Sequence, residues 1–347
     1  MPLSPTAPGP READERPALI LANLGTPAEP RPRAVRSFLR EFLSDRRVVE
    51  THPLLWRPVL EGIILRVRPR ASAAKYATVW RPGEETSRSG SPLMHYSERQ
   101  GELLQQELGE SVQVRIAMRY GQPALRCVMG ELMEAGCRRI ALLPLYPQYA
   151  ASSAGTVVDE AARFILASRN QPELRTVRSF ETAPAYIEAL ATALEQHWRV
   201  HGRPDPAAGE RLLLSFHSIP QAMHDAGDPY RAECERTVEL LSQRLNLPDG
   251  LAQLTFQSVF GPAAWIGPAT IDTVGELGRA GCPRLDVICP GFLSDCLETL
   301  EEINQLNRET FTTAGGGSFY YIPWGNDSDG AIAILAEQAR NVLAGWI

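Results

Sequence analysis

The chain has 347 residues, of which 44% are hydrophobic, and it carries a formal net charge of -6. A chain of this length exceeds the size at which a single core usually keeps growing, so we expect two medium domains rather than one large domain. The acidic balance gives no basic footprint for a phosphate backbone, which argues against nucleic acid as a partner.

The N-terminus combines proline with charged residues. Residues 1–16 contain no apolar run of the kind found in a secretory signal, and we expect them to form a disordered lead. No window of the chain approaches the ~18 to 20 consecutive apolar residues of a transmembrane helix. The sequence therefore predicts a cytoplasmic protein and leaves open a peripheral contact with the inner face of the membrane.

From Pro17 onward, short apolar runs alternate with amphipathic stretches. We expect strands at 18–25, 112–118, 139–146, 174–180, 211–217, 252–259, 285–290 and 318–323. We expect helices near 33–44, 123–136, 155–168, 183–200, 230–245, 270–280, 295–311 and 328–345. Continuously apolar strands separated by helices indicate an α/β fold, in which helices cover both faces of a parallel sheet.

One part of the chain recurs at a constant offset of 145 residues. ELMEAGCRRIALLPLY, which begins at 131, is partly repeated by ELGRAGCPRLDVICPGF, which begins at 276. Two Rossmann-like, doubly wound domains that face each other across a cleft explain the repeat most simply. Convergence on a common helix, glycine and strand pattern is the alternative. We expect the first domain to span 17–178 plus 326–347, and the second to span 179–325.

In doubly wound sheets, functional groups collect at the carboxyl ends of the strands. The residues that follow the predicted strands are polar, aromatic or turn-forming, at 23–27, 119–121, 146–149, 217–220, 257–262 and 290–295. The first of these exits has one glycine where a dinucleotide fingerprint needs three, and neither GxxxxGK[ST] nor GxSxG occurs in the chain. Nucleotide binding and a hydrolase-type serine nucleophile are therefore disfavoured.

His217 stands at the end of the predicted strand 211–217. A lone histidine at a strand end is more often a hydrogen-bonded structural residue than a catalytic one. An imidazole titrates near neutral pH, however, and is a common proton acceptor in active sites. Its role therefore depends on which groups face it.

A predicted helix follows the strand exit at 290–295, with Asp295 as its cap. It carries Glu298 and Glu302 four residues apart on one face, and its apolar side consists of Leu297, Leu300, Ile303 and Leu306. A solvated acidic helix is the alternative. Because the helix starts directly after a strand, Glu298 is expected to face His217 across the cleft. An imidazole and a carboxylate can accept protons and hold a divalent cation briefly.

Nine motifs occur in the order and at the spacing of one known family. They are LILANLGTP, FLSDRRVVE, SGSPLMHYSERQ, MRYGQPAL, LPLYPQYAASSAG, LSFHSIP, GDPY, TFQSVFGPAAWIGPAT and PGFLSDCLETLEEINQLNRE. The sequence resembles ferrochelatase over residues 17–345. The resemblance implies insertion of Fe²⁺ into protoporphyrin IX to form protoheme, with release of two protons, in a cleft between two chelatase-type Rossmann-like domains.

The resemblance also assigns roles to individual residues. His217 matches the histidine to which the family's pyrrole proton abstraction, iron binding or both are attributed. Glu298 matches the partner acid on the opposite wall, so both residues are expected to contact the substrate Fe²⁺. Glu302 matches a position one turn further along a path for protons or iron. The implied porphyrin-binding residues are Leu24, Arg119, Tyr120, Trp265 and Phe292.

Two positions depart from patterns common in the family. Leu24 stands where relatives that use coproporphyrin often carry tyrosine, which favours protoporphyrin as the substrate. Val259 stands where a basic residue is common, so any contact made by that charge is in doubt. Two alternatives stay open: a coproporphyrin III ferrochelatase and, from a different class, a non-catalytic tetrapyrrole or heme carrier.

The cysteines do not form a metal-binding pattern. No two have CxxC spacing, and reduced thiols are expected at Cys127, Cys137, Cys234, Cys282, Cys289 and Cys296. Their positions also differ from those in the family's iron-sulfur forms. We therefore expect neither a [2Fe-2S] cluster nor any tightly bound cofactor.

Residues 50–95 are expected to form a lip beside the cleft. Residues at helical spacing suggest an apolar face made of Leu55, Trp56, Val59, Leu60 and Ile63. Residues 56–75 carry five basic groups and one acidic residue, Glu61. A lip that rests on an anionic membrane and a helix that packs on its own domain explain this pattern equally well.

Overall fold

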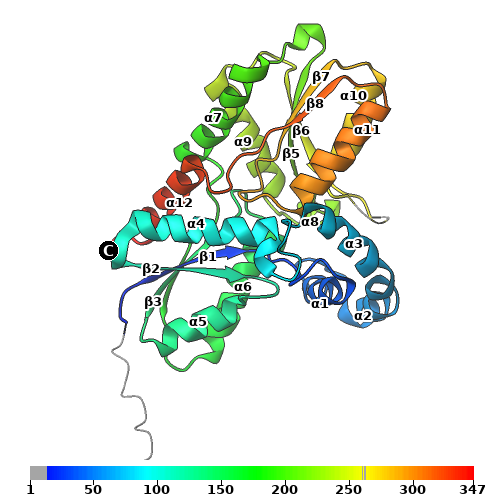
Figure 1. Ribbon diagram of the computed structural model, residues 1–347. Coiled ribbons are helices and arrows are strands. Elements are labelled where there is room, and N and C mark those ends of the chain that lie inside the picture. Colours follow the sequence, from blue (N-terminus) through cyan, green and yellow to red (C-terminus); the bar gives the residue numbers. More distant parts are fainter. Residues whose placement is uncertain (1–13, 260, 262) are drawn as a thin grey trace, which may run out of the picture.

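The computed structural model describes residues 14–259, 261 and 263–347, and it contains two parallel sheets with helices on both faces (Figure 1). Most of the predicted N-terminal lead, residues 1–13, lies outside the described residues. All eight predicted strands are present. The predicted α/β architecture with two doubly wound sheets is therefore confirmed.

The first sheet has the order β2-β1-β3-β4. Its strands are β1 (Ala18–Asn23), β2 (Gln113–Met118), β3 (Arg139–Pro144) and β4 (Glu173–Thr176). The side chains of β1 alternate between the two faces. Leu19 and Leu21 join the core that includes α4 (Pro92–Leu108), whereas Ile20 packs with α5 (Leu125–Glu134) and α6 (Thr156–Ala167). Every residue of β1 is buried, as expected for a central strand covered on both faces.

The second sheet has the order β6-β5-β7-β8. Its strands are β5 (Arg211–His217), β6 (Ala252–Gln257), β7 (Arg284–Ile288) and β8 (Ser318–Tyr321). The helices that cover its two faces are α7 (Pro184–His201), α9 (Tyr230–Leu245), α10 (Thr270–Arg279) and α11 (Arg308–Thr313). Leu212, Leu214 and Phe216 pack on the α7 and α9 side, while Leu213 packs on the α10 and α11 side.

The repeat in the sequence corresponds to equivalent parts of the two sheets. β3 and β7 each lie between the central strand and the edge strand, and each follows a short helix, α5 or α10. The Cys137 thiol donates to the Arg139 carbonyl oxygen at 3.4 Å, and the Cys282 thiol donates to the Arg284 carbonyl oxygen at 3.1 Å. Shared topology and shared local bonds support two copies of one domain. The residue boundaries of the two domains stay a prediction.

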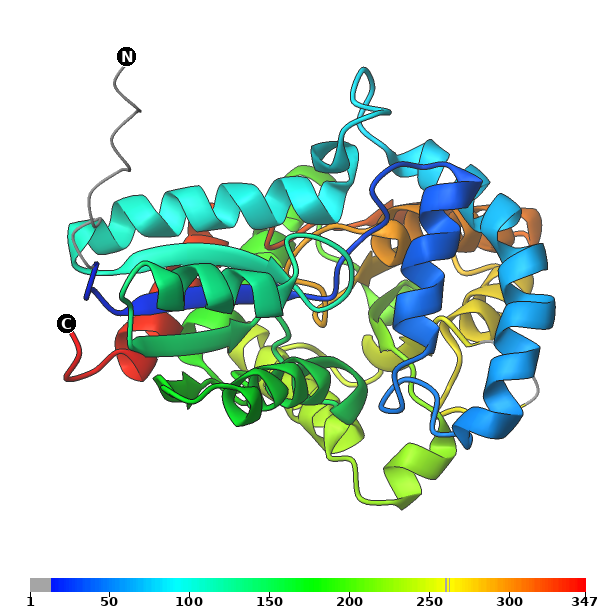
Figure 2. The ribbon, with the colours of Figure 1, turned by 90° about the horizontal axis from the view of Figure 1, so that it is seen from below.

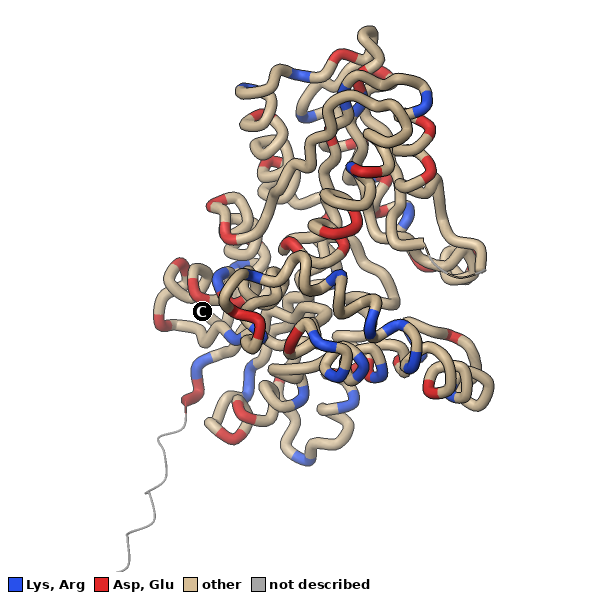
Figure 3. The backbone as a smooth tube through the Cα atoms, turned by 45° about the vertical axis from the view of Figure 1, so that its right-hand side comes forward, with Lys and Arg blue, Asp and Glu red and all other residues tan. Residues whose placement is uncertain are grey.

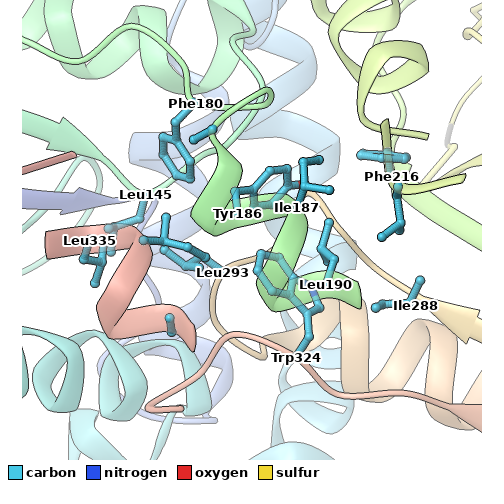
Figure 4. Close-up of a cluster of buried hydrophobic side chains, with 14 of the residues drawn as sticks. Leu145, Phe180, Tyr186, Ile187, Leu190, Phe216, Ile288, Leu293, Trp324 and Leu335 are labelled. Atoms are coloured by element: carbon cyan, nitrogen blue, oxygen red, sulfur yellow. The ribbon is translucent and has the colours of Figure 1, made fainter. Parts of the chain in front are cut away.

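A shared core joins the two sheets. Side chains from both halves of the chain meet around α7 and α12 (Asp329–Val342), where Leu145, Phe180, Tyr186 and Trp324 lie close together (Figure 4). The rings of Tyr186 and Trp324 meet edge to face at 5.5 Å. This packing fixes the first sheet relative to the second and therefore sets the position of the strand exits.

Helix α4 was not among the predicted helices. Its sequence has no clear apolar stripe and contains Gly101 in its interior, where glycine lowers helix propensity. A Cβ built on Gly101 would lie 3.0 Å from the side chain of Ile116 on β2. The glycine therefore lets α4 lie close to the first sheet, an advantage that local propensity does not reveal.

The acidic helix predicted near 295–311 is wider than an α-helix over most of its length. It forms the π-helix η6 (Glu298–Asn307), and the α-helix α11 continues it. Its buried residues are Thr299, Ile303 and Asn307, four apart, and Leu306 is exposed. The predicted apolar side is therefore only partly correct, because it assumed α-helical periodicity: Ile303 is buried, but Leu297 and Leu300 are only partly buried. π-Helical segments are rare and often mark functional sites.

The predicted lip, residues 50–95, belongs for the most part to an arm made of α1 (Pro32–Leu43), α2 (Pro53–Val59), the π-helix η1 (Leu60–Ile64) and α3 (Leu65–Val79). The helix α1 precedes the predicted lip in the chain, and residues 80–95 follow the arm. Figure 2 shows the arm in blue at one side of the molecule, beside orange and yellow segments from the second half of the chain. The helix α3 packs against η6. The remaining short elements are η2 (Arg88–Gly90), η3 (Gly109–Ser111), η4 (Ala151–Gly155), η5 (Pro206–Ala208) and α8 (Gln221–Asp225).

The single apolar face predicted for this arm is only partly correct. Leu60 is buried, and the Trp56 indole nitrogen donates to the Leu43 carbonyl oxygen at 2.7 Å. The apolar residues that the arm does expose have exposed fractions of 38% to 77%. They are Leu54, Leu55, Val59, Ile63 and Val67. The π-helical turn of η1 shifts the period, so the arm both packs on its own domain and exposes an apolar row.

Candidate active site

His217 ends β5, the strand that lies between β6 and β7 in the second sheet. Its ring is partly buried, and Nδ1 lies 2.5 Å from the carbonyl oxygen of Ser218. Because a carbonyl oxygen can only accept, Nδ1 of the ring carries the proton. The other nitrogen, Nε2, then has a free lone pair and can act as a base.

Glu302 lies within electrostatic reach of His217. The carboxylate of Glu302 accepts the backbone N–H of Ser258 at 2.6 Å and the Ser258 hydroxyl at 2.5 Å. Burial raises the pKa of Glu302 above its ordinary value, the Ser258 bonds and His217 oppose this rise, and Glu298 adds to it. The structure thus brings together the histidine and both glutamates that the sequence singled out.

Glu298 begins η6, and its surroundings come from several elements. Its carbonyl oxygen accepts the side-chain amide of Gln257 at 2.9 Å. Burial, and then the Glu298 carboxylate, raise the pKa of the Cys296 thiol well above its usual value. Cys296 is therefore a protonated neighbour of this carboxylate. The predicted contact of Glu298 with Fe²⁺ stays a prediction.

Two tyrosines that the sequence left without a role lie near Glu298. Burial raises the pKa values of Tyr76 and Tyr146 well above the usual range, and Glu298 contributes to both shifts. Among the described residues, the buried hydroxyl of Tyr146 has no hydrogen-bond partner. Tyr146 follows β3 at a strand exit, so its position in the sequence could have marked it as a candidate site residue. Tyr76 belongs to α3 and is brought in only by packing between the domains.

Arg119 and Tyr120 follow β2 and share one partner, Asp45. The Arg119 guanidinium bonds to the Asp45 carboxylate and also donates to the Thr156 carbonyl oxygen at 2.9 Å, and the Tyr120 hydroxyl donates to Asp45 at 3.0 Å. Tyr120 is fully buried, with its ring edge-on to Phe42 at 5.2 Å. Tyr120 is thus a core residue here, and a contact with a macrocycle would require this core to open.

The other predicted porphyrin contacts lie at strand exits. Leu24 follows β1 and is partly buried against the core between β1 and the arm, and Phe292 follows β7 and is partly buried. Trp265 lies on the segment that pairs with Pro220, three residues after His217. Their contact with a porphyrin stays a prediction.

The arm closes one side of this site. Lys75 of α3 forms an ion pair with Glu301 of η6, with 2.9 Å between the ammonium nitrogen and a carboxylate oxygen. Lysine and arginine residues recur along the arm (Figure 3). Within the described residues, no group of three or more histidine, cysteine, aspartate or glutamate side chains could hold a metal ion. An ion that meets His217 and Glu298 would therefore have few protein ligands, which suits transfer better than storage.

The chain is similar to known proteins over most of its length. A model of the ferrochelatase family matches residues 16–343. The chain is 49% identical to the ferrochelatase of Aromatoleum aromaticum over 337 residues, which cover 96% of this chain and 89% of the relative. It is 44% identical to that of Methylobacillus flagellatus over 342 residues, or 97% and 96% of the two chains.

A solved structure supports the fold. SirB from Bacillus subtilis with Fe3+ superposes with a TM-score of 0.52 at 15% identity, over 73% of this chain and 92% of that one. At this identity the likeness concerns the two-domain chelatase fold alone. Family membership is shown instead by the family match and by the high identity to several relatives over nearly the whole chain. The chain belongs to the ferrochelatase family, the enzymes that insert a metal ion into a porphyrin in heme biosynthesis.

Proposed function

We propose that the protein inserts Fe²⁺ into protoporphyrin IX and forms protoheme with release of two protons. The observation that carries the proposal is the grouping of His217, Glu298 and Glu302 at the carboxyl end of the second sheet. A ring nitrogen able to accept a proton lies there beside carboxylates that can pass it on. Residues of the first domain close the same site.

The proton balance follows from the chemistry of the ring. As Fe²⁺ enters, each of the two inner N–H groups loses its proton, and the nitrogen lone pair forms a bond to the metal. Nε2 of His217 accepts the protons one at a time, because Nδ1 is engaged with Ser218. Glu302 lies within electrostatic reach of the imidazole and carries each proton onward to water.

The binding energy of a porphyrin is large enough to distort it. Saddling the ring so that iron can enter costs roughly 1 to 5 kcal/mol as substrate strain. Burial of about 500 Å² of apolar macrocycle contributes roughly 12 kcal/mol before association costs, at about 25 cal/mol per Å². The flattened product then fits less well than the saddled substrate, which favours its release.

Protoporphyrin IX is favoured over coproporphyrin III by Leu24. This side chain cannot bind iron and presents an apolar surface at the exit of β1, where the first sheet meets the arm. Purified protein is incubated anaerobically with Fe²⁺ and either porphyrin, and loss of the free-porphyrin absorbance bands is followed. Faster metalation of protoporphyrin supports the proposal, whereas faster metalation of coproporphyrin would contradict it and identify coproporphyrin III as the substrate.

A heme carrier is the alternative from a different class. The enzyme requires a base at His217, so His217→Ala is expected to abolish metalation while porphyrin still binds. A carrier would bind heme tightly, show no turnover and be indifferent to the substitution. Wild-type protein that gives no metalation above the uncatalysed rate would contradict the proposed enzyme.

We also propose that the arm rests on the surface of an anionic membrane. The exposed row that includes Leu55 and Ile63 lies on the same arm as the basic residues. Among the described residues, no helix is long and apolar enough to cross a membrane. Leu55→Ser with Ile63→Ser should reduce sedimentation with anionic vesicles. Val200→Ser, an exposed apolar site on α7, is the control and should leave sedimentation unchanged.

A further inference from the structure

The end of β6 holds two of the three glutamates of η6, Glu298 and Glu302. Gln257 donates its side-chain amide to the Glu298 carbonyl oxygen at 2.9 Å. The next residue, Ser258, donates its backbone N–H to one Glu302 oxygen at 2.6 Å and its hydroxyl to the other at 2.5 Å. A single residue therefore binds both oxygens of the carboxylate that lies near His217.

A buried polar network fixes the orientation of Gln257. Its amide oxygen accepts the Ser215 hydroxyl at 2.8 Å, and this hydroxyl is also 2.8 Å from that of Thr270. All three side chains are buried within the second sheet and its covering helix. Because the oxygen is engaged inside the sheet, the amide nitrogen points to η6. The strand that neighbours β5 is thereby tied to the π-helix.

The backbone of Ser258 adopts an uncommon conformation. Its φ of 66° lies in the left-handed region, which is costly for a residue with a side chain. Glycine would adopt this conformation more readily. A serine nevertheless occupies the position, and in this conformation its N–H and hydroxyl reach the same carboxylate. Strain of this kind persists where the surroundings hold it in place, often at functional sites.

We propose that Ser258 is a positioning residue that fixes the Glu302 carboxylate beside His217, so that Glu302 can take the proton from Nε2. The inference rests on the proposed function, because that proton is the one released by metalation. Ser258 does not itself contact the porphyrin in this proposal. It acts through Glu302, whose two oxygens it holds in one orientation.

Two substitutions distinguish the effect of the Ser258 hydroxyl from the effect of its backbone conformation. Ser258→Ala removes the hydroxyl bond and keeps the strained φ, whereas Ser258→Gly removes the hydroxyl bond and relieves the strain. Both are expected to lower kcat about tenfold, with KM for porphyrin unchanged, and the glycine variant should melt at the higher temperature. If the glycine variant keeps wild-type kcat while the alanine variant loses it, backbone conformation accounts for the effect and the proposal is overturned.

A double-mutant cycle tests whether Ser258 acts through Glu302. In a Glu302→Gln background, Ser258→Ala should cause little further loss of kcat, because the carboxylate to be positioned is gone. Independent, multiplying losses would overturn the proposal. Ser168→Ala is the matched control, since its hydroxyl donates to the Phe164 carbonyl oxygen in the first domain, and it should retain wild-type kcat.

A measurement without turnover distinguishes this inference from the proposed function. The infrared carboxyl bands of Glu302, identified by subtraction of the Glu302→Gln spectrum, should shift in Ser258→Ala and stay unchanged in Ser168→Ala. Unshifted bands in Ser258→Ala overturn the positioning role even if the wild type metalates porphyrin. Shifted bands together with an inactive wild type would contradict the proposed enzyme and, with it, the role of Ser258 in catalysis. The contact between Ser258 and Glu302 would still be confirmed.

Discussion

Lys75 on α3 and Glu301 on η6 form an ion pair that joins the arm of the first domain to the π-helix of the second. The lysine side chain is 47% exposed and the glutamate side chain 14%, so the pair contributes only about 0 to 1 kcal/mol to stability. The next residue, Tyr76, is partly buried, and it lies close enough to Glu298 for this carboxylate to raise the tyrosine pKa further. The ion pair therefore lies where the arm closes over the site.

Lys75→Ala is expected to loosen this closure. Loss of about 0.5 to 1 kcal/mol would speed porphyrin exchange about two- to fivefold, with little change in melting temperature. Stopped-flow fluorescence of the free porphyrin measures the rate. Arg126→Ala is the control, because Arg126 pairs with Glu160 at 3.1 Å on the surface of the first domain. Equal exchange rates in both variants would show that the pair does not control closure.

Asp45→Ala is expected to destabilise the first domain strongly. The side chains of Arg119 and Asp45 are only 9% and 6% exposed, and removal of one partner from a buried pair costs about 3 to 5 kcal/mol. Urea unfolding measures the loss. Asp159→Ala serves as the control: its bond to Arg47 is 2.9 Å long, but the side chains are 30% and 46% exposed, so less than about 1 kcal/mol should be lost. Similar losses in the two variants would contradict this reasoning.

Glu302→Gln should raise the free energy of unfolding near pH 7. Burial raises the pKa of Glu302 in the folded protein, so the ionised carboxylate destabilises the folded state. For a carboxyl of this kind, stability is lost as the pH rises from the unfolded-state pKa through the folded-state pKa. The variant should gain on the order of 1 kcal/mol at pH 7.

The gain from Glu302→Gln should vanish below about pH 4, where the carboxyl is protonated in both states. Chemical unfolding at several pH values measures it. Glu309→Gln, at an exposed glutamate of α11, is the control and should leave stability unchanged at every pH. A gain that does not depend on pH would point to packing rather than charge.

Two helical glycines should respond in opposite directions to alanine. A Cβ at Gly278 of α10 would lie 2.6 Å from the Phe311 carbonyl oxygen, whereas a Cβ at Gly130 of α5 would meet nothing within 4 Å. Gly130→Ala should therefore stabilise the protein by about 0.4 to 1 kcal/mol. Gly278→Ala should destabilise it, because backbone must move. Thermal unfolding measures both, and a stabilised Gly278→Ala variant would contradict the close approach.

Much of the fold could be predicted from the sequence because the relevant signals are local. Continuous apolar runs identified the strands, and a repeat of helix, glycine and strand indicated two equivalent domains. The strand exits supplied His217, and the helix that follows β7 supplied Glu298 and Glu302. Each of these residues lies in or next to a strand or helix that the surrounding sequence predicts.

Residues that depend on contacts between distant elements could not be predicted in the same way. Tyr76 approaches Glu298 only because α3 packs on η6. Tyr120 follows a strand exit yet is buried, because Asp45 and Phe42 from the arm region enclose it. The role of Ser258 likewise appears only when its two bonds to Glu302 are seen.

The sequence by itself determined the alternation of strands and helices, the two-domain plan, the family and the identity of the histidine and glutamates. The tertiary structure alone decided that the acidic helix widens to a π-helix, that Ser258 holds Glu302, and which residues of the arm face outward. The physical reason is that side-chain periodicity follows from the helix type, and packing against the sheet and the arm selects that type. Local pattern fixes which residues are available, and packing fixes which of them meet.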